Sequence, residues 1–157
     1  MKNFLPLLAI LCAFSTQLAA QNTPPNITLE VAFLEMAYNG NLVAVQEFVS
    51  KGTPVDSTVD DKSTALMWAA FNGHTAVAAY LIERGATVDA KDSNGRTALL
   101  YASSGPYAET VGLLLRNGAA VDTIDRDGDT AKKFAREKGH TAMLELLESQ
   151  LVKGSTP

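Results

Sequence analysis

The sequence predicts an all-α solenoid of about four helix-turn-helix repeats, joined by short β-hairpin-like turns. The first observation is that several residues recur every 33 positions, and a fixed period of this length is typical of stacked-repeat proteins. The second is that the copies share a pattern of short helix, tight glycine turn and second helix. The recurring residues are Thr64, Thr97 and Thr130; Gly52, Gly85 and Gly118; Asp56, Asp89 and Asp122; and Ala69, Ala102 and Ala135.

The composition agrees with this fold class. Hydrophobic residues make up 46% of the 157 residues and aromatic residues only 7%, which suits a helical protein with an aliphatic core. This length allows one domain preceded by a leader.

The best-preserved copy identifies the kind of repeat. It reads TALMWAA from Thr64 to Ala70, continues with Asn72-Gly73-His74, and has LIERGA from Leu81 to Ala86. These motifs resemble the ankyrin repeat, over roughly residues 28–150. The resemblance implies an ankyrin-repeat solenoid at 28–152, with repeats at about 28–60, 61–92, 93–125 and 126–150, which binds another protein without catalysis.

The first 20 residues predict a secretory signal peptide. Lys2 gives a positive start, an apolar run follows from Phe4 to Phe14, and a small, polar stretch ends at Ala20. Eleven apolar residues are too few to cross a bilayer about 30 Å thick. We therefore expect cleavage after Ala20, no stable membrane anchor afterwards, and a periplasmic or extracellular location.

The segment 21–27 predicts a flexible leader, because Pro24-Pro25 favours extended backbone over helix. The first repeat lacks the threonine signature of the later copies. A terminal repeat has one neighbour instead of two, so we expect this copy to be the N-terminal cap.

The second repeat shows most clearly why helices should form. Thr64 is placed to cap the first helix with its hydroxyl. Leu66, Ala69 and Ala70 then fall on one helical face, and the alanines allow neighbouring helices to approach closely. Gly73 is expected to close the helix with a positive φ.

The third repeat has Ser104-Gly105-Pro106-Tyr107 in place of the usual turn. We expect a distorted turn in which Gly105 takes the role that Gly73 has in the second repeat. The fourth repeat carries charges that suit a solvent-facing C-terminal cap, and residues 153–157 are expected to form a disordered tail.

The sequence lacks the residues that several classes of function require. A net charge of −4 and the absence of a basic patch argue against nucleic acid. His74 and His140 follow turn glycines and are interpreted as structural, and the only cysteine, Cys12, lies in the predicted signal peptide. No metal-ligand spacing, catalytic triad or phosphate-binding loop occurs, so no cofactor is expected.

One stretch of the sequence leaves open a function of a different class. Residues 125–129, Asp-Arg-Asp-Gly-Asp, resemble the opening of a calcium loop. Thr130 and Arg136 stand where such a loop needs glycine and glutamate, and the same stretch fits a repeat hairpin. The alternative is a small metal-dependent protein or enzyme that uses the Asp125–Asp129 cluster.

The family resemblance implies a partner-binding concave face made of hairpin tips and first helices. Trp68 and Tyr101 have a second interpretation, as packing between first helices, whereas Phe71 is the better candidate for an exposed anchor. The implied residues are Asp60, Asp61, Ser63, Trp68, Phe71, Asn72, Ser93, Asn94, Arg96, Tyr101, Ser104, Arg126, Asp127 and Asp129.

The sequence thus favours a monomeric, non-catalytic interaction module, exported from a bacterial cell. One specific version is an inhibitor or immunity partner of a secreted enzyme or toxin. The leader and the TALMWAA variant, which resembles bacterial ankyrin repeats, point to a bacterial source.

Overall fold

The structure, a computed structural model, describes residues 28–154. The predicted signal peptide, the leader and residues 155–157 lie outside this range. The described part contains eight helices in four pairs and no β-strand longer than a single bridge. The pairs are α2 (Leu29–Tyr38) with α3 (Leu42–Ser50), α4 (Ala65–Phe71) with α5 (Thr75–Glu83), α6 (Ala98–Ser103) with α7 (Ala108–Arg116), and α8 (Ala131–Glu137) with α9 (Thr141–Gly154).

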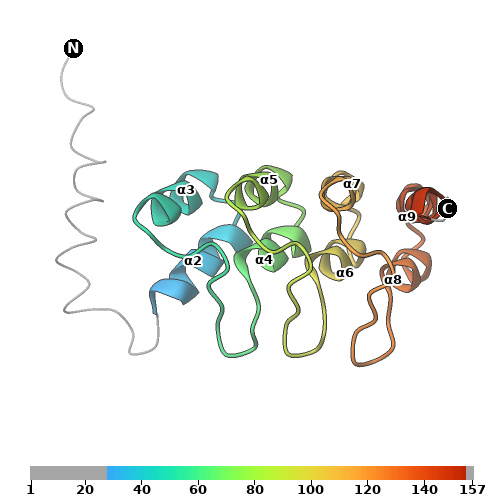
Figure 1. Cartoon of the computed structure of the whole chain (residues 1–157), viewed down its shortest axis with the longest axis horizontal. Helices are drawn as coiled ribbons and strands as arrows, with labels where there is room; N and C mark the ends of the chain where they lie inside the picture. Colours follow the sequence, from blue (N-terminus) through green and yellow to red (C-terminus); the bar gives the residue numbers. More distant parts are fainter. Residues whose placement is uncertain (1–27, 155–157) are drawn as a thin grey trace, which may run out of the picture.

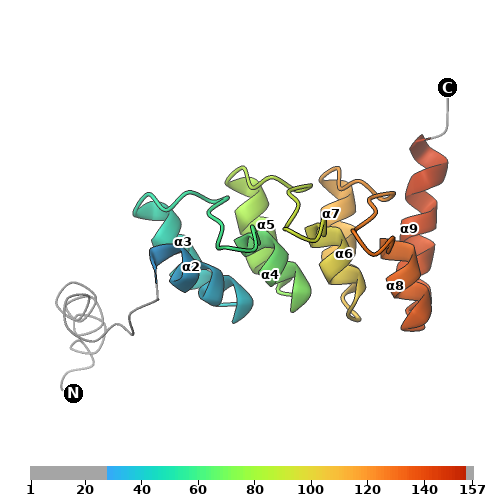
Figure 2. The same ribbon diagram turned by 90° about the horizontal axis from the view of Figure 1, so that it is seen from below.

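The pairs stack in sequence order into an elongated, two-layered solenoid (Figure 1). The first helices α2, α4, α6 and α8 form one row and the second helices α3, α5, α7 and α9 form the other. Seen from below, neighbouring first helices lie side by side along the stack (Figure 2). The predicted all-α stacked-repeat fold is therefore confirmed.

Threonine hydroxyls begin three of the four first helices, because each accepts a hydrogen bond from the amide three residues later. The distances are 3.4 Å for Thr28, 3.3 Å for Thr64 and 3.2 Å for Thr130. The predicted cap at Thr64 is confirmed. Thr97 stands at the same position before α6, but its buried hydroxyl has no hydrogen-bond partner among the described residues.

The turns between paired helices behave differently in the second and third repeats. Gly73 has a φ of 69°, so its predicted left-handed conformation is confirmed. The expectation for Gly105 was wrong, because Gly105 is not among the glycines with positive φ. Pro106 follows it, and the residue before a proline favours extended backbone. Gly105 instead leaves room for the ring of Tyr107, which a side chain at this position would overlap.

The core is one continuous apolar layer between the two rows of helices. Leu66, Ala69 and Ala70 are buried as their spacing on α4 predicts. Alanines on the facing sides of the first helices are buried as well, and their small side chains let the helices pack closely. These alanines are Ala65, Ala69, Ala98, Ala102, Ala131 and Ala135.

Extended hairpins project from the row of first helices between successive repeats (Figure 1). The first contains an antiparallel bridge between Thr58 and Thr64. The next two are each closed by an amide that donates to a carbonyl four residues later, which gives the predicted β-hairpin-like turns. The closing pairs are Asp92 with Arg96 (3.0 Å) and Asp125 with Asp129 (3.1 Å).

The hairpins are also linked to one another through their backbones. The Ser93 amide donates to the Asp61 carbonyl at 2.7 Å, and the Arg126 amide donates to the Asn94 carbonyl at 2.9 Å. Because peptide groups make these links, the hairpin tips have a fixed spacing beside the first helices.

The last helix is longer than its counterparts. α9 continues to Gly154 and so includes the first two residues of the tail expected at 153–157. In the part of the chain that the structure describes, no helix is both long enough and apolar enough to cross a membrane.

Candidate functional site

Four aromatic side chains meet on the face of the first helices, and we call them the aromatic quartet. Tyr38 ends α2, Trp68 and Phe71 lie on α4, and Tyr101 lies on α6. Trp68 and Phe71 share a face because they are three residues apart on one helix. The ring centroids are 5.6 Å apart for Tyr38–Trp68, 6.1 Å for Trp68–Phe71, 5.9 Å for Phe71–Tyr101 and 6.4 Å for Trp68–Tyr101.

The quartet presents aromatic surface to solvent. Tyr38 is 43% exposed and Phe71 is 38% exposed, so both rings offer part of their surface to solvent. Trp68 and Tyr101 are half-buried and pack against the core. Trp68 and Tyr101 therefore fill space between first helices and also lie next to the exposed rings of the quartet.

Trp68 is held by the hairpin that precedes its own helix. Its Nε1 donates to Ser63 Oγ at 3.0 Å, and Ser63 Oγ donates to Asp61 Oδ1 at 2.6 Å. Ser63 is buried, with 1% of its surface exposed. Ser63 therefore orients the tryptophan ring and is not itself open to a partner.

Tyr101 is held in the same way by the next hairpin. Its hydroxyl donates to Asp92 Oδ2 at 2.7 Å, while Asp92 Oδ1 accepts from the amides of Asn94 and Arg96, each at 2.8 Å. Burial and the bond to Asp92 raise the pKa of Tyr101. The phenol thus stays protonated and remains a hydrogen-bond donor at neutral pH.

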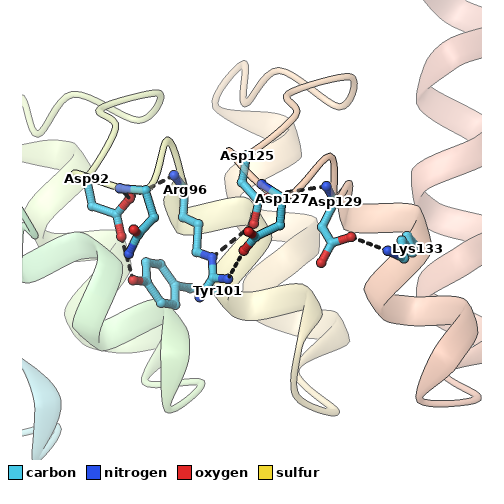
Figure 3. Close-up of polar contacts among 8 residues, drawn as sticks. Asp92, Arg96, Tyr101, Asp125, Asp127, Asp129 and Lys133 are labelled. Atoms are coloured by element: carbon cyan, nitrogen blue, oxygen red, sulfur yellow. Dashed lines mark hydrogen bonds and ion pairs between the residues drawn. The ribbon is translucent and has the colours of Figure 1, made fainter.

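Arg96 connects this hairpin to the following one (Figure 3). Its Nε donates to Asp125 Oδ2 at 3.0 Å and its Nη2 donates to Asp127 Oδ2 at 3.3 Å. The hydrogen bond from Arg96 to Asp125 is the main reason that the pKa of Arg96 is raised. The paired arginine fixes the spacing of the two hairpin tips.

Asp125 is the buried end of this connection. Burial tends to raise the pKa of Asp125, but hydrogen bonds from the Asp129 amide, the Arg96 side chain and the Asp127 amide outweigh burial and lower it. Asp125 therefore stays ionised, and its role is to organise the turn.

The contacts of the Asp125–Asp129 cluster bear on the metal-dependent alternative. Asp125 and Asp127 face Arg96, and Asp129 binds the Lys133 ammonium (Figure 3). Among residues 28–154, no group of three or more His, Cys, Asp or Glu side chains is placed to hold a metal ion. The arrangement favours a structural role for this cluster over a calcium site.

An open apolar groove, lined in part by Tyr38 and Trp68 of the quartet, lies at the N-terminal end of the same face. It has a volume of about 370 Å³, and we call it the N-terminal groove. Its lining comes from α2, from the first hairpin and from α4. The lining residues are Val31, Leu34, Glu35, Tyr38, Val59 and Trp68.

Sequence reasoning missed this groove, although a signal was present. Val59 stands one repeat before Asp92 and two repeats before Asp125. Glu35 likewise stands one repeat before Trp68 and two repeats before Tyr101. A carboxylate thus stands where the later first helices have a ring, and an aliphatic side chain stands where the later hairpins have a carboxylate. These two differences mark a local change in the surface.

Comparison with known families agrees with the geometry. The family model described as ankyrin repeats (3 copies) matches residues 33–125 and again residues 87–156. The chain belongs to the ankyrin repeat family. No curated protein was found to match the chain. Ankyrin repeats generally mediate protein–protein interactions.

The remaining residues that the ankyrin resemblance implied occupy three kinds of environment. Asp60, Asp61, Asn94, Arg126 and Asp127 are exposed at the hairpin tips. Ser93, Arg96 and Asp129 are half-buried in the hairpins, and Arg96 and Asp129 take part in ion pairs. Asn72 and Ser104 are half-buried, and each donates a side-chain hydrogen bond to a backbone carbonyl on the first helices.

Two polar side chains tie the second ankyrin repeat to the first. Asn72 Nδ2 donates to the Tyr38 carbonyl at 2.7 Å, and His74 Nε2 lies 2.9 Å from the same oxygen. Both contacts fix the end of α2, where the Tyr38 ring enters the quartet. Asn72 therefore positions the surface instead of offering a free amide to a partner.

Proposed function

We propose that this ankyrin-repeat protein binds another protein through its concave face, with the aromatic quartet at the centre of the contact. The observation that carries the proposal is the exposure of Tyr38 and Phe71 next to two rings that the hairpins orient. Exposed aromatic side chains on a rigid support provide large contact area at low entropic cost.

The rigidity of the surroundings supports this proposal. Backbone bonds link the hairpins, Arg96 joins two of them, and the quartet lies on packed helices. A surface that is ordered before binding loses less conformational entropy when the partner docks.

The test is affinity capture with the chain from Gln21 onward, using a cell-envelope extract of the source organism. The double variant Tyr38→Ala/Phe71→Ala should lose the captured protein. The matched control is Val43→Ala, because Val43 is 75% exposed on α3 in the other row of helices. Urea unfolding of each bait checks that the helices remain folded.

A protein held by the native chain and by Val43→Ala, but lost by the double variant, would support the proposal. Equal capture by all three baits would place the interaction elsewhere on the molecule. If the captured protein is a secreted enzyme or toxin, stoichiometric addition of the native chain should lower its activity, as the inhibitor or immunity version requires.

We also propose that the protein acts outside the cytoplasm. The support is the pattern of residues 1–20, together with the absence of cysteine from residues 21–157. Fractionation of bacterial cells expressing the full chain should place it in the periplasm or medium, and N-terminal sequencing should begin at Gln21. Recovery of uncleaved chain from the cytoplasm would contradict the proposal.

A further inference from the structure

We propose that the N-terminal groove binds an arginine side chain from an exposed segment of the partner protein. The proposal rests on the proposed function and specifies the chemistry of its partner. The arginine stem would lie along the apolar lining, its guanidinium would stack on Trp68 and Tyr38, and Glu35 would accept its hydrogen bonds.

The shape of the groove follows from two residues, Glu35 and Val59, that differ from their counterparts in the later repeats. Glu35 lies where later first helices have the rings of Trp68 and Tyr101. In the third repeat, the ring of Tyr101 packs beside Trp68 and reaches Asp92 on the hairpin. At the N-terminal end of the row, the Glu35 carboxylate takes the place of a ring beside Trp68. Val59, nine residues before Trp68, takes the place of the carboxylate that Asp92 provides nine residues before Tyr101, so the space between them stays open.

The charge of the groove favours a cation. Glu35 carries the only carboxylate among the lining residues, and it is exposed. Asp60 directly follows Val59 at the hairpin tip and is also exposed. Neither carboxylate forms an ion pair with the residues that the structure describes. Asp61 adds a third exposed carboxylate, against one exposed lysine, Lys62, on the same hairpin.

The mixture of aromatic, aliphatic and acidic surface favours arginine over other side chains. A guanidinium is planar, stacks on aromatic rings and binds a carboxylate with two parallel hydrogen bonds. Its three-carbon stem also covers apolar surface while the charge remains in contact with water. A purely apolar side chain would leave the Glu35 carboxylate unmatched.

Trp68 makes the test specific, because it is the only tryptophan in the chain and lies in the groove. The probe is the peptide acetyl-Gly-Leu-Arg-Leu-Gly-amide, titrated against the protein while tryptophan fluorescence is recorded. Its partner probe carries citrulline, which has the shape of arginine without the charge. We expect a saturable change with the arginine peptide and about tenfold weaker binding of the citrulline peptide.

Protein variants distinguish the effect of the carboxylate in the groove from the effect of the net negative charge of the protein. Glu35→Gln should weaken binding of the arginine peptide about three- to tenfold. Glu83→Gln makes the same change of charge on α5, in the other row of helices, and should leave binding unchanged. Lys62→Glu should strengthen binding, because it removes the one cation of the bordering hairpin tip.

Three outcomes would overturn the proposal. Equal affinity for the arginine and citrulline peptides would identify an apolar occupant, and the proposed function would stand. If neither peptide gives a saturable change in fluorescence, the groove is not a peptide-binding site. The capture experiment would still decide the proposed function. A change of Trp68 fluorescence with protein concentration alone would identify a second copy of the chain as the occupant.

Discussion

The ring of Tyr107 lies against the backbone of Gly73 in the preceding repeat, so closely that a side chain at Gly73 would overlap it. His74 has the same relationship to Gly40 one repeat earlier. Each of these rings begins a second helix and covers the turn of the preceding repeat. Turn glycines at Gly40 and Gly73 therefore meet two requirements, a positive φ of 70° and 69° and room for a neighbouring ring.

Gly73→Ala should lower the free energy of unfolding more than Gly85→Ala does. Both glycines have positive φ, which costs alanine about 1–2 kcal/mol. Only Gly73 also faces a ring, whereas nothing lies within 4 Å of a side chain added at Gly85. Urea unfolding measures both losses. In a Tyr107→Ala background the two substitutions should cost nearly the same, and a persistent difference would contradict the ring contact.

The caps of α4 and α6 should respond differently to loss of a hydroxyl. Thr64→Val removes a bond to the Met67 amide and should cost about 1 kcal/mol in the free energy of unfolding. Thr97→Val should be neutral or stabilising, because the buried Thr97 hydroxyl has no partner among the described residues. Urea titration of both variants is the measurement, and equal losses would show that Thr97 also caps its helix.

Asp125 should make stability depend on pH in the acidic range. Its pKa in the folded protein is lowered, so the ionised carboxylate favours folding. This contribution is complete above the unfolded pKa of about 3.9 and is lost as pH falls through the lower folded pKa. Asp125→Asn should therefore cost about 1–3 kcal/mol at pH 7 and much less near pH 2. Urea unfolding at both pH values tests this, and a pH-independent difference would argue against it.

Substitutions at Leu99 and Phe71 should lower the free energy of unfolding by different amounts. Leu99 is fully buried on α6, so Leu99→Ala should cost about 2–5 kcal/mol through the cavity it leaves. Phe71 is 38% exposed, and Phe71→Ala should cost clearly less in the same urea titration. A loss at Phe71 equal to that at Leu99 would mean that the ring serves the core instead of the exposed surface.

The sequence by itself determined the fold because its signals act within one repeat. A threonine that starts a helix, alanines on one face and a glycine that closes the turn each depend on residues a few positions away. Repeating these signals every 33 residues defined the helix pairs and their stacking. It also placed the aromatic residues of α4 and α6 on the face of the first helices.

The tertiary structure alone decided how residues of different repeats meet. The pairing of Arg96 with Asp125 and Asp127, the packing of Tyr107 on Gly73 and the opening of the N-terminal groove depend on the distance between stacked repeats. Gly105 took an unexpected conformation for a similar reason, because its turn accommodates both Pro106 and the ring of Tyr107. Local propensity carries no information on such contacts, since they form only after the helices have packed.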